Sequence, residues 1–95
     1  MTGVQTCALP ISGVQNTGLG RAALYQLTTG NNNTAVGWNT LLASTIANQN
    51  TSVGSNSLAN NTADNNTGVG YLSLNANTSG TSNTAIGAKI GRAHV

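Results

Sequence analysis

The chain has 95 residues, and Asn (15), Thr (14), Gly (12) and Ser (8) together supply just over half of them. It carries three basic side chains and one acidic side chain, for a formal net charge of +2. The chain has no stripe of basic side chains that could bind a phosphate backbone, so we expect no nucleic-acid partner. No apolar run approaches the roughly 20 residues that span a bilayer as a helix, so we expect no membrane insertion in this fragment.

The two end segments differ in sequence from everything between them. Residues 1–11 read MTGVQTCALPI, and residues 90–95 read IGRAHV. Both resemble translations, in opposite orientations, of a common short-read sequencing-library adapter. We therefore expect both segments to be adapter-derived, and residues 12–89 to be a repeat fragment of a longer protein. The only cysteine, Cys7, and the only histidine, His94, fall in these segments, so neither supports a redox or metal site.

One motif recurs five times between the ends, at spacings of 17, 17, 16 and 17 residues. The copies are NTGLG at Asn16, NTAVG at Asn33, NTSVG at Asn50, NTGVG at Asn66 and NTAIG at Asn83. A period kept this strictly predicts one coil stacked on itself. Helices are disfavoured because Gly, Asn and Thr are poor in helix interiors. The predicted fold class is therefore all-β, a parallel β-roll or β-solenoid of about five coils of 16–17 residues.

Two positions of each coil are apolar when the leading Asn is counted as position zero. Position three follows N-T-x, which we expect to form a short strand. The residues after it are expected to form a second short strand that ends at position eight. Both positions are predicted to point into the core: Leu19, Val36, Val53, Val69 and Ile86 at position three, and Leu24, Leu41, Leu58 and Leu74 at position eight.

Other positions are fixed by size or by hydrogen bonding. Position four is a glycine that permits a sharp turn, because glycine tolerates positive φ; these residues are Gly20, Gly37, Gly54, Gly70 and Gly87. Position two is always small, and we expect it to lie on the face opposite the aliphatic row, where another chain approaches; it is occupied by Gly18, Ala35, Ser52, Gly68 and Ala85. Coils stacked about 4.8 Å apart would let the leading asparagines form side-chain hydrogen-bond ladders.

The natural part of the chain offers little chemistry. Its charged residues are Arg21, Asp64 and Lys89, from which no carboxylate pair, catalytic triad or metal cluster can be assembled. No glycine-rich nucleotide loop occurs either. We therefore expect no catalysis, no metal and no cofactor. Asp64 aligns at position fourteen with Gly30, Ala47 and Gly80, where a turn-capping role is expected.

Position five is variable and bulky in three coils, where it holds Arg21, Trp38 and Tyr71. Exposed aromatic residues together with arginine are typical of binding hot spots. We consider these three residues a candidate surface-binding row. The alternative is a mixed surface row that only covers the corner of the coil.

The motif at Asn33 and Asn83, followed by xxxL and an NTTG-like turn, resembles the repeats of phage tail-fibre and tail-spike proteins. It is also similar to the NSVAIG-type head repeats of YadA-like trimeric autotransporter adhesins, although the period here is longer. The resemblance spans residues 16–87. It implies a left-handed coil, a homotrimer, a place outside the cell on a virion tail or a bacterial surface, and attachment to a host-surface glycan or protein.

Two alternatives to a fibre segment remain at the level of sequence. One is a glycan-binding β-solenoid domain of a carbohydrate-active enzyme, which would need clustered acidic residues. The other is a low-complexity disordered tract, which the composition alone would suit. A disordered tract would not hold apolar residues in a fixed phase with the Asn-Thr motif, and this chain does.

Overall fold

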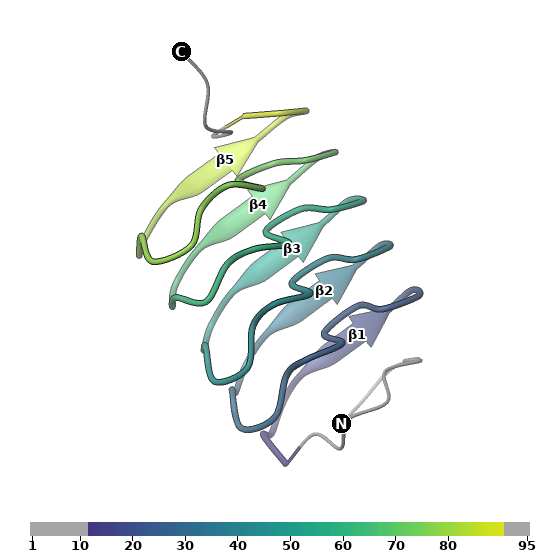
Figure 1. The fold of residues 1–95 in the computed structure, drawn as a ribbon, viewed down its shortest axis with the longest axis vertical. Helices are drawn as coiled ribbons and strands as arrows, with labels where there is room; N and C mark the ends of the chain where they lie inside the picture. The colour runs from purple at the N-terminus through teal and green to yellow at the C-terminus, as the bar shows by residue number, and fades with distance from the viewer. Residues whose placement is uncertain (1–11, 91–95) are drawn as a thin grey trace.

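The computed structural model describes residues 12–90 as a stack of coils, each contributing one three-residue strand (Figure 1). The strands are β1 (Thr17–Leu19), β2 (Thr34–Val36), β3 (Thr51–Val53), β4 (Thr67–Val69) and β5 (Thr84–Ile86). They pair in parallel, in chain order and in register, in a molecule measuring 38 × 21 × 16 Å. The described residues contain no helix. The predicted all-β parallel solenoid is confirmed, while Cys7, His94 and the adapter-like ends, apart from Ile90, lie outside the described residues.

A ladder of buried asparagines joins each coil to the next just before the strands. The Asn33 backbone N–H donates to Asn16 Oδ1 at 3.0 Å, and Asn16 Nδ2 donates to the Gly30 carbonyl of its own coil at 2.8 Å. The same backbone-to-side-chain bond recurs from Asn50, Asn66 and Asn83 to the asparagine one coil earlier. Asparagine carries both an acceptor and donors. One side chain can therefore link two coils and also bond within its own coil. The predicted side-chain ladder is confirmed for Asn16, Asn33 and Asn50, whose amide groups bond to one another.

The interior is narrow and is filled from one side by leucine. Leu24, Leu41 and Leu58 are fully buried, and Leu74 is 7% exposed, so the position-eight prediction is confirmed. Across the interior lie the small position-two residues, all buried: Gly18, Ala35, Ser52, Gly68 and Ala85. A Cβ added at Gly18 would lie 3.1 Å from Leu24 Cδ1. Position two is therefore small because leucine occupies the space opposite it, and the predicted approach of another chain at this row is wrong.

The position-three row faces outward, so its predicted place in the core is also wrong. Leu19 is 48% exposed and Ile86 is 64% exposed, while Val36, Val53 and Val69 are half-buried. Successive side chains of a strand point to opposite faces. Because position two points inward on each three-residue strand, position three has to point outward with the threonine at position one.

Buried hydroxyl groups form a further row that the sequence pattern did not reveal. Position seven holds Thr40, Ser57 and Ser73, all fully buried. Ser57 Oγ donates to the Gly68 carbonyl at 2.9 Å, and Ser73 Oγ donates to the Ala85 carbonyl at 3.0 Å. These bonds join the segment that follows the turn glycine of one coil, which we call the returning segment, to the strand of the next coil. They also satisfy hydroxyl groups whose burial without a hydrogen bond would be costly.

The segment after each turn glycine does not form the second strand that we expected. Its residues at positions six and eight have left-handed backbones, as Asn39 (φ 56°) and Leu41 (φ 52°) show. Regular strands need a strongly negative φ, so this segment is a series of turns. It still bonds to both neighbouring coils: the Asn39 N–H donates to the Arg21 carbonyl, and the Leu41 N–H donates to the Ser57 carbonyl, both at 3.1 Å.

The glycine turn is confirmed, with φ between 123° and 129° at Gly20, Gly37, Gly54, Gly70 and Gly87. Residues with a Cβ rarely adopt this backbone. Close stacking adds a second restriction: a Cβ at Gly54 would lie 2.7 Å from the carbonyl oxygen of Gly70 in the next coil. Both the turn and the stacking distance therefore require glycine.

We expect Gly54→Ala to lower the free energy of unfolding by at least about 2 kcal/mol, because it combines backbone strain with a clash against Gly70. The matched control is Gly18→Ala, since Ala35 and Ala85 already occupy the equivalent position and only a flexible leucine side chain has to yield. Urea denaturation followed by circular dichroism measures both. Equal losses in the two variants would contradict the role assigned to the turn.

We expect Asn33→Ala to lower the free energy of unfolding by about 3 kcal/mol, because it leaves buried polar groups of two neighbours without partners. Those groups are the Ala47 carbonyl and the Asn50 N–H; Asn16 Oδ1 keeps its bond from the backbone N–H of residue 33. Asn60→Ala is the control: its exposed side chain makes one bond, to the Asn75 carbonyl, so the loss should stay below about 1 kcal/mol. Similar losses in the same denaturation experiment would show that the ladder has no special weight.

Candidate functional site

The outer face of the sheet carries one aliphatic side chain on every strand. Register pairing places Leu19 beside Val36, and the row continues through Val53 and Val69 to Ile86. None of the five strands contains a charged residue. Parallel sheets normally have both faces covered. A continuous, uncharged aliphatic row on the open face is therefore a candidate contact surface, and we call it the outer row.

The candidate surface-binding row follows the turn glycines at the ends of the strands. Trp38 is 49% exposed and Tyr71 is 51% exposed, and Arg21 is exposed as well. The structure brings Arg21 and Trp38 together at one pocket, whereas Tyr71 is not among the residues that line it. The predicted outward placement is confirmed, and the binding role of the row remains a prediction.

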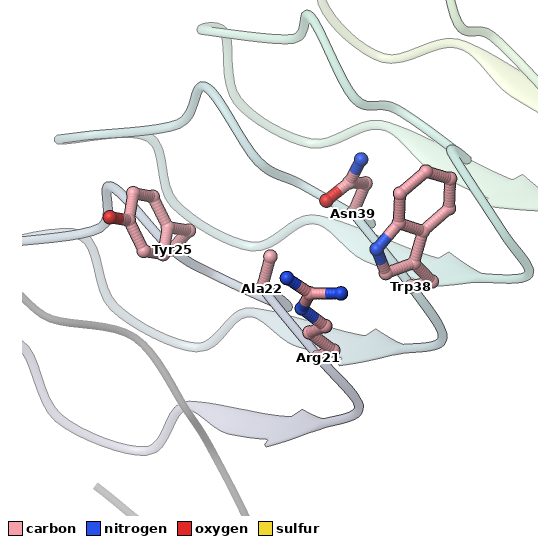
Figure 2. Close-up of a pocket in the computed structure, with 5 residues that line it drawn as sticks. All are labelled: Arg21, Ala22, Tyr25, Trp38 and Asn39. Carbon is pink, nitrogen blue, oxygen red and sulfur yellow. The ribbon is translucent and has the colours of Figure 1, made fainter.

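The pocket has a volume of about 650 Å³ and lies over the segments that return from the strands of the first two coils (Figure 2). Tyr25 and Trp38 stand on either side of Arg21 and Ala22, with Asn39 near the middle of the group. Tyr25, Ala22 and Asn39 were not among the candidate residues identified from the sequence. All three follow a turn glycine, in the first or the second coil, as Arg21 and Trp38 do. This shared placement in the repeat is the sequence feature that could have identified them.

The backbone fixes the shape of this pocket. The Asn39 N–H donates to the Arg21 carbonyl at 3.1 Å, which ties the two coils together under the side chains. Ala22 (φ 64°) and Asn39 (φ 56°) are equivalent left-handed residues in adjacent coils. The surrounding hydrogen bonds hold both residues in this backbone conformation. The direction in which each side chain leaves the backbone at the rim of the pocket is therefore fixed.

The only acidic side chain of the chain, Asp64, is part of a second ladder. Its Oδ1 accepts a hydrogen bond from the Asn48 N–H at 2.7 Å, just as Asn48 Oδ1 accepts from the Asn31 N–H at 2.8 Å. This bond joins two neighbouring coils, whereas a turn-capping aspartate bonds its own local backbone, so Asp64 is a ladder residue and the predicted turn-capping role stays a prediction. Asp64 lies in the segment that leads into a strand, whereas Arg21 follows the end of a strand. The Asp64 carboxylate is hydrogen-bonded in the ladder and does not neutralise Arg21.

The alignment of Asp64 with Gly30 and Ala47 needs a correction. Asn33 Nδ2 donates to the Ala47 carbonyl at 2.8 Å, and Asn50 Nδ2 makes the same bond to the Ala63 carbonyl at 2.9 Å. Ala63 is therefore the counterpart of Gly30 and Ala47. The 16-residue spacing arises from one residue missing just before Ala63, which moved Asp64 by one position when residues were counted from the leading Asn.

Within residues 12–90 no three His, Cys, Asp or Glu side chains come together in a group that could hold a metal ion. The same part of the chain contains no helix long and apolar enough to cross a membrane. Comparisons with protein-family models, with curated proteins and with solved structures find no significant match to this chain.

Proposed function

We propose that this chain is a segment of an oligomeric, non-enzymatic surface fibre, and that copies pack against one another through the outer row. The observation that carries the proposal is the placement of Leu19, Val36, Val53, Val69 and Ile86 on the open face of the sheet. Burying half-exposed aliphatic side chains against a partner removes them from water and lowers the free energy of the assembly. A contact made by the same position in every coil extends along the whole stack.

A second copy of the chain suits this surface better than an unrelated partner. The outer row is straight, uncharged and repeated at the spacing of the strands, so an identical row in the same register is complementary to it. Copies arranged around an axis parallel to the stack would keep that register from the first coil to the last. Closed symmetric assembly is the usual solution for identical chains, and the resemblance to tail fibres and adhesin heads suggests three copies.

The expected area explains why the fragment alone should associate weakly. Five strands about 4.8 Å apart give a row about 19 Å long. With a width of about 10 Å, each copy would bury roughly 200 Å², against the 800 Å² or so per partner of a standard stable interface. Every further coil would lengthen the contact. Stable assembly is therefore a property of a long repeat, which is what a fibre provides.

Attachment and location follow from the same resemblance. A stacked coil converts sequence length into physical length, which suits a fibre that projects from a virion tail or a bacterial surface toward a host-surface glycan or protein. The composition favours a passive role, since residues 12–89 hold a single acidic side chain and no histidine, and therefore neither a carboxylate pair nor a carboxylate–histidine pair for general acid–base catalysis.

Replacing Val53 with lysine should weaken self-association at least about tenfold, because symmetric copies would bring like charges together in a contact that excludes water. The side chain points outward, so the coil itself should tolerate the change. Sedimentation equilibrium at protein concentrations up to the millimolar range gives the association constant and the stoichiometry. Circular dichroism checks that the variant is folded.

The matched control is Ser55→Lys, which places the same charge on the same coil but beyond the turn glycine and off the sheet face. It should leave association unchanged. If both lysine variants associate like the parent chain, the outer row is not the contact. A chain with residues 16–49 duplicated in tandem should associate more tightly than the parent; a duplicated chain that stays monomeric would refute the oligomeric fibre.

A further inference from the structure

We propose that the pocket between the first two coils binds a single pyranose ring that carries a carboxylate, as hexuronic and sialic acids do. The inference deepens the proposed function, because it names the class of host-surface group that the segment would contact. It rests on five side chains: Arg21, Ala22, Tyr25, Trp38 and Asn39.

The aromatic side chains suit the faces of a sugar ring. The face of an aromatic ring is electron-rich, and the axial C–H groups of a pyranose are weakly positive, so the two surfaces attract while both leave water. Tyr25 and Trp38 lie on either side of the pocket (Figure 2), at 37% and 49% exposure. A ring bound in the pocket could pack its C–H face against either of these two aromatic side chains.

Arg21 supplies a positive charge that forms no ion pair with another residue of the described range 12–90. Its guanidinium lies between the two aromatic side chains (Figure 2). The one acidic side chain of the chain, Asp64, is held by the Asn48 N–H in the second ladder. The planar, forked guanidinium matches the geometry of a carboxylate and is less strongly hydrated than an ammonium group. A carboxylate on the bound ring would therefore find its complement in the pocket.

Two neutral groups complete the site. The Asn39 amide both donates and accepts hydrogen bonds, and so does the Tyr25 hydroxyl. Such groups suit the hydroxyls of a sugar. A single guanidinium is too little positive charge for a polyphosphate or nucleic acid, which is bound by several cations.

The pocket is not required by the repeat. Arg21 and Trp38 occupy the same position in the first two coils, and the third coil has Ser55 there. The position of Tyr25 is occupied by Leu42 in the second coil and by Ala59 in the third. The coils stack in register regardless of these side chains. Because the fold accepts a small polar residue here, the combination of Trp, Tyr and Arg at one pocket is better explained by ligand binding than by stability.

Trp38 is the only tryptophan, so intrinsic fluorescence reports on this pocket directly. We expect glucuronic acid and N-acetylneuraminic acid, titrated separately, to change the emission with dissociation constants on the order of millimolar. Glucose, which lacks the carboxylate, should bind at least about tenfold more weakly because it makes no charge-assisted bond. Comparing the two acids distinguishes a uronic acid site from a sialic acid site.

Arg21→Gln should remove the preference for the acids over glucose and leave the weak glucose response in place. Lys89→Gln is the matched control, since it removes an exposed cation outside the pocket and should change neither titration. Equal binding of glucose and both acids, or an Arg21→Gln variant with unchanged affinity, would overturn the proposal. So would inorganic phosphate competing as well as the sugar acids, because the site would then select charge alone.

The outcome is separable from the fibre proposal. Val53→Lys alters the outer row and should leave the sugar titrations unchanged, while Arg21→Gln should leave sedimentation unchanged. A parent chain that self-associates but shows no response to either acid would reject the pocket alone. A chain that binds the acids and remains monomeric even when residues 16–49 are duplicated would reject the fibre alone.

Discussion

The asparagine that precedes each strand is the interaction on which the rest of this structure depends. A short solenoid has little apolar area to bury, so its coils are held in register by polar groups that can reach both neighbours. Asn33 does this with one side chain, which accepts from the Asn50 N–H in the next coil and donates to Asn16 and to the Ala47 carbonyl. Once these bonds fix the register, the strand positions and the width of the interior follow.

The narrow interior then assigns a size to each position. Leucine at position eight and a hydroxyl or alanine at position seven fill one side, so the strand opposite can offer only a small inward residue. Gly68 illustrates the limit, since an added Cβ would lie 2.9 Å from Ser57 Oγ and 3.3 Å from Leu58 Cγ. The aliphatic residue next to it on each strand has no room inside. It is placed on the open face by geometry, which creates the outer row without any loss to the core.

Much of this was predictable from the repeat. The period indicated stacked coils, and the invariant glycine, leucine and asparagine indicated the turn, one core row and the ladder. The position-three row was misplaced because an aliphatic residue in every coil was taken as interior. The more informative signal was the uniform smallness of Gly18, Ala35 and Ser52, which marks the side of a strand that faces a filled space. The left-handed backbone of Leu41 and its equivalents could not be foreseen, because leucine rarely adopts it and only the stacked neighbours hold it there.

The pocket was only partly visible in the sequence for a related reason. Position five identified Arg21 and Trp38, but a list of equivalent positions treats Tyr71 as a third member of the same row. The pocket is formed instead by different repeat positions in adjacent coils. Tyr25, at position nine of the first coil, and Asn39, at position six of the second, line the same pocket. Repeats fix the inner positions by stacking and leave the outer positions free to vary. A site specific to one pair of coils can therefore arise on a scaffold whose coils are otherwise equivalent, and nothing in the scaffold has to change to accommodate it.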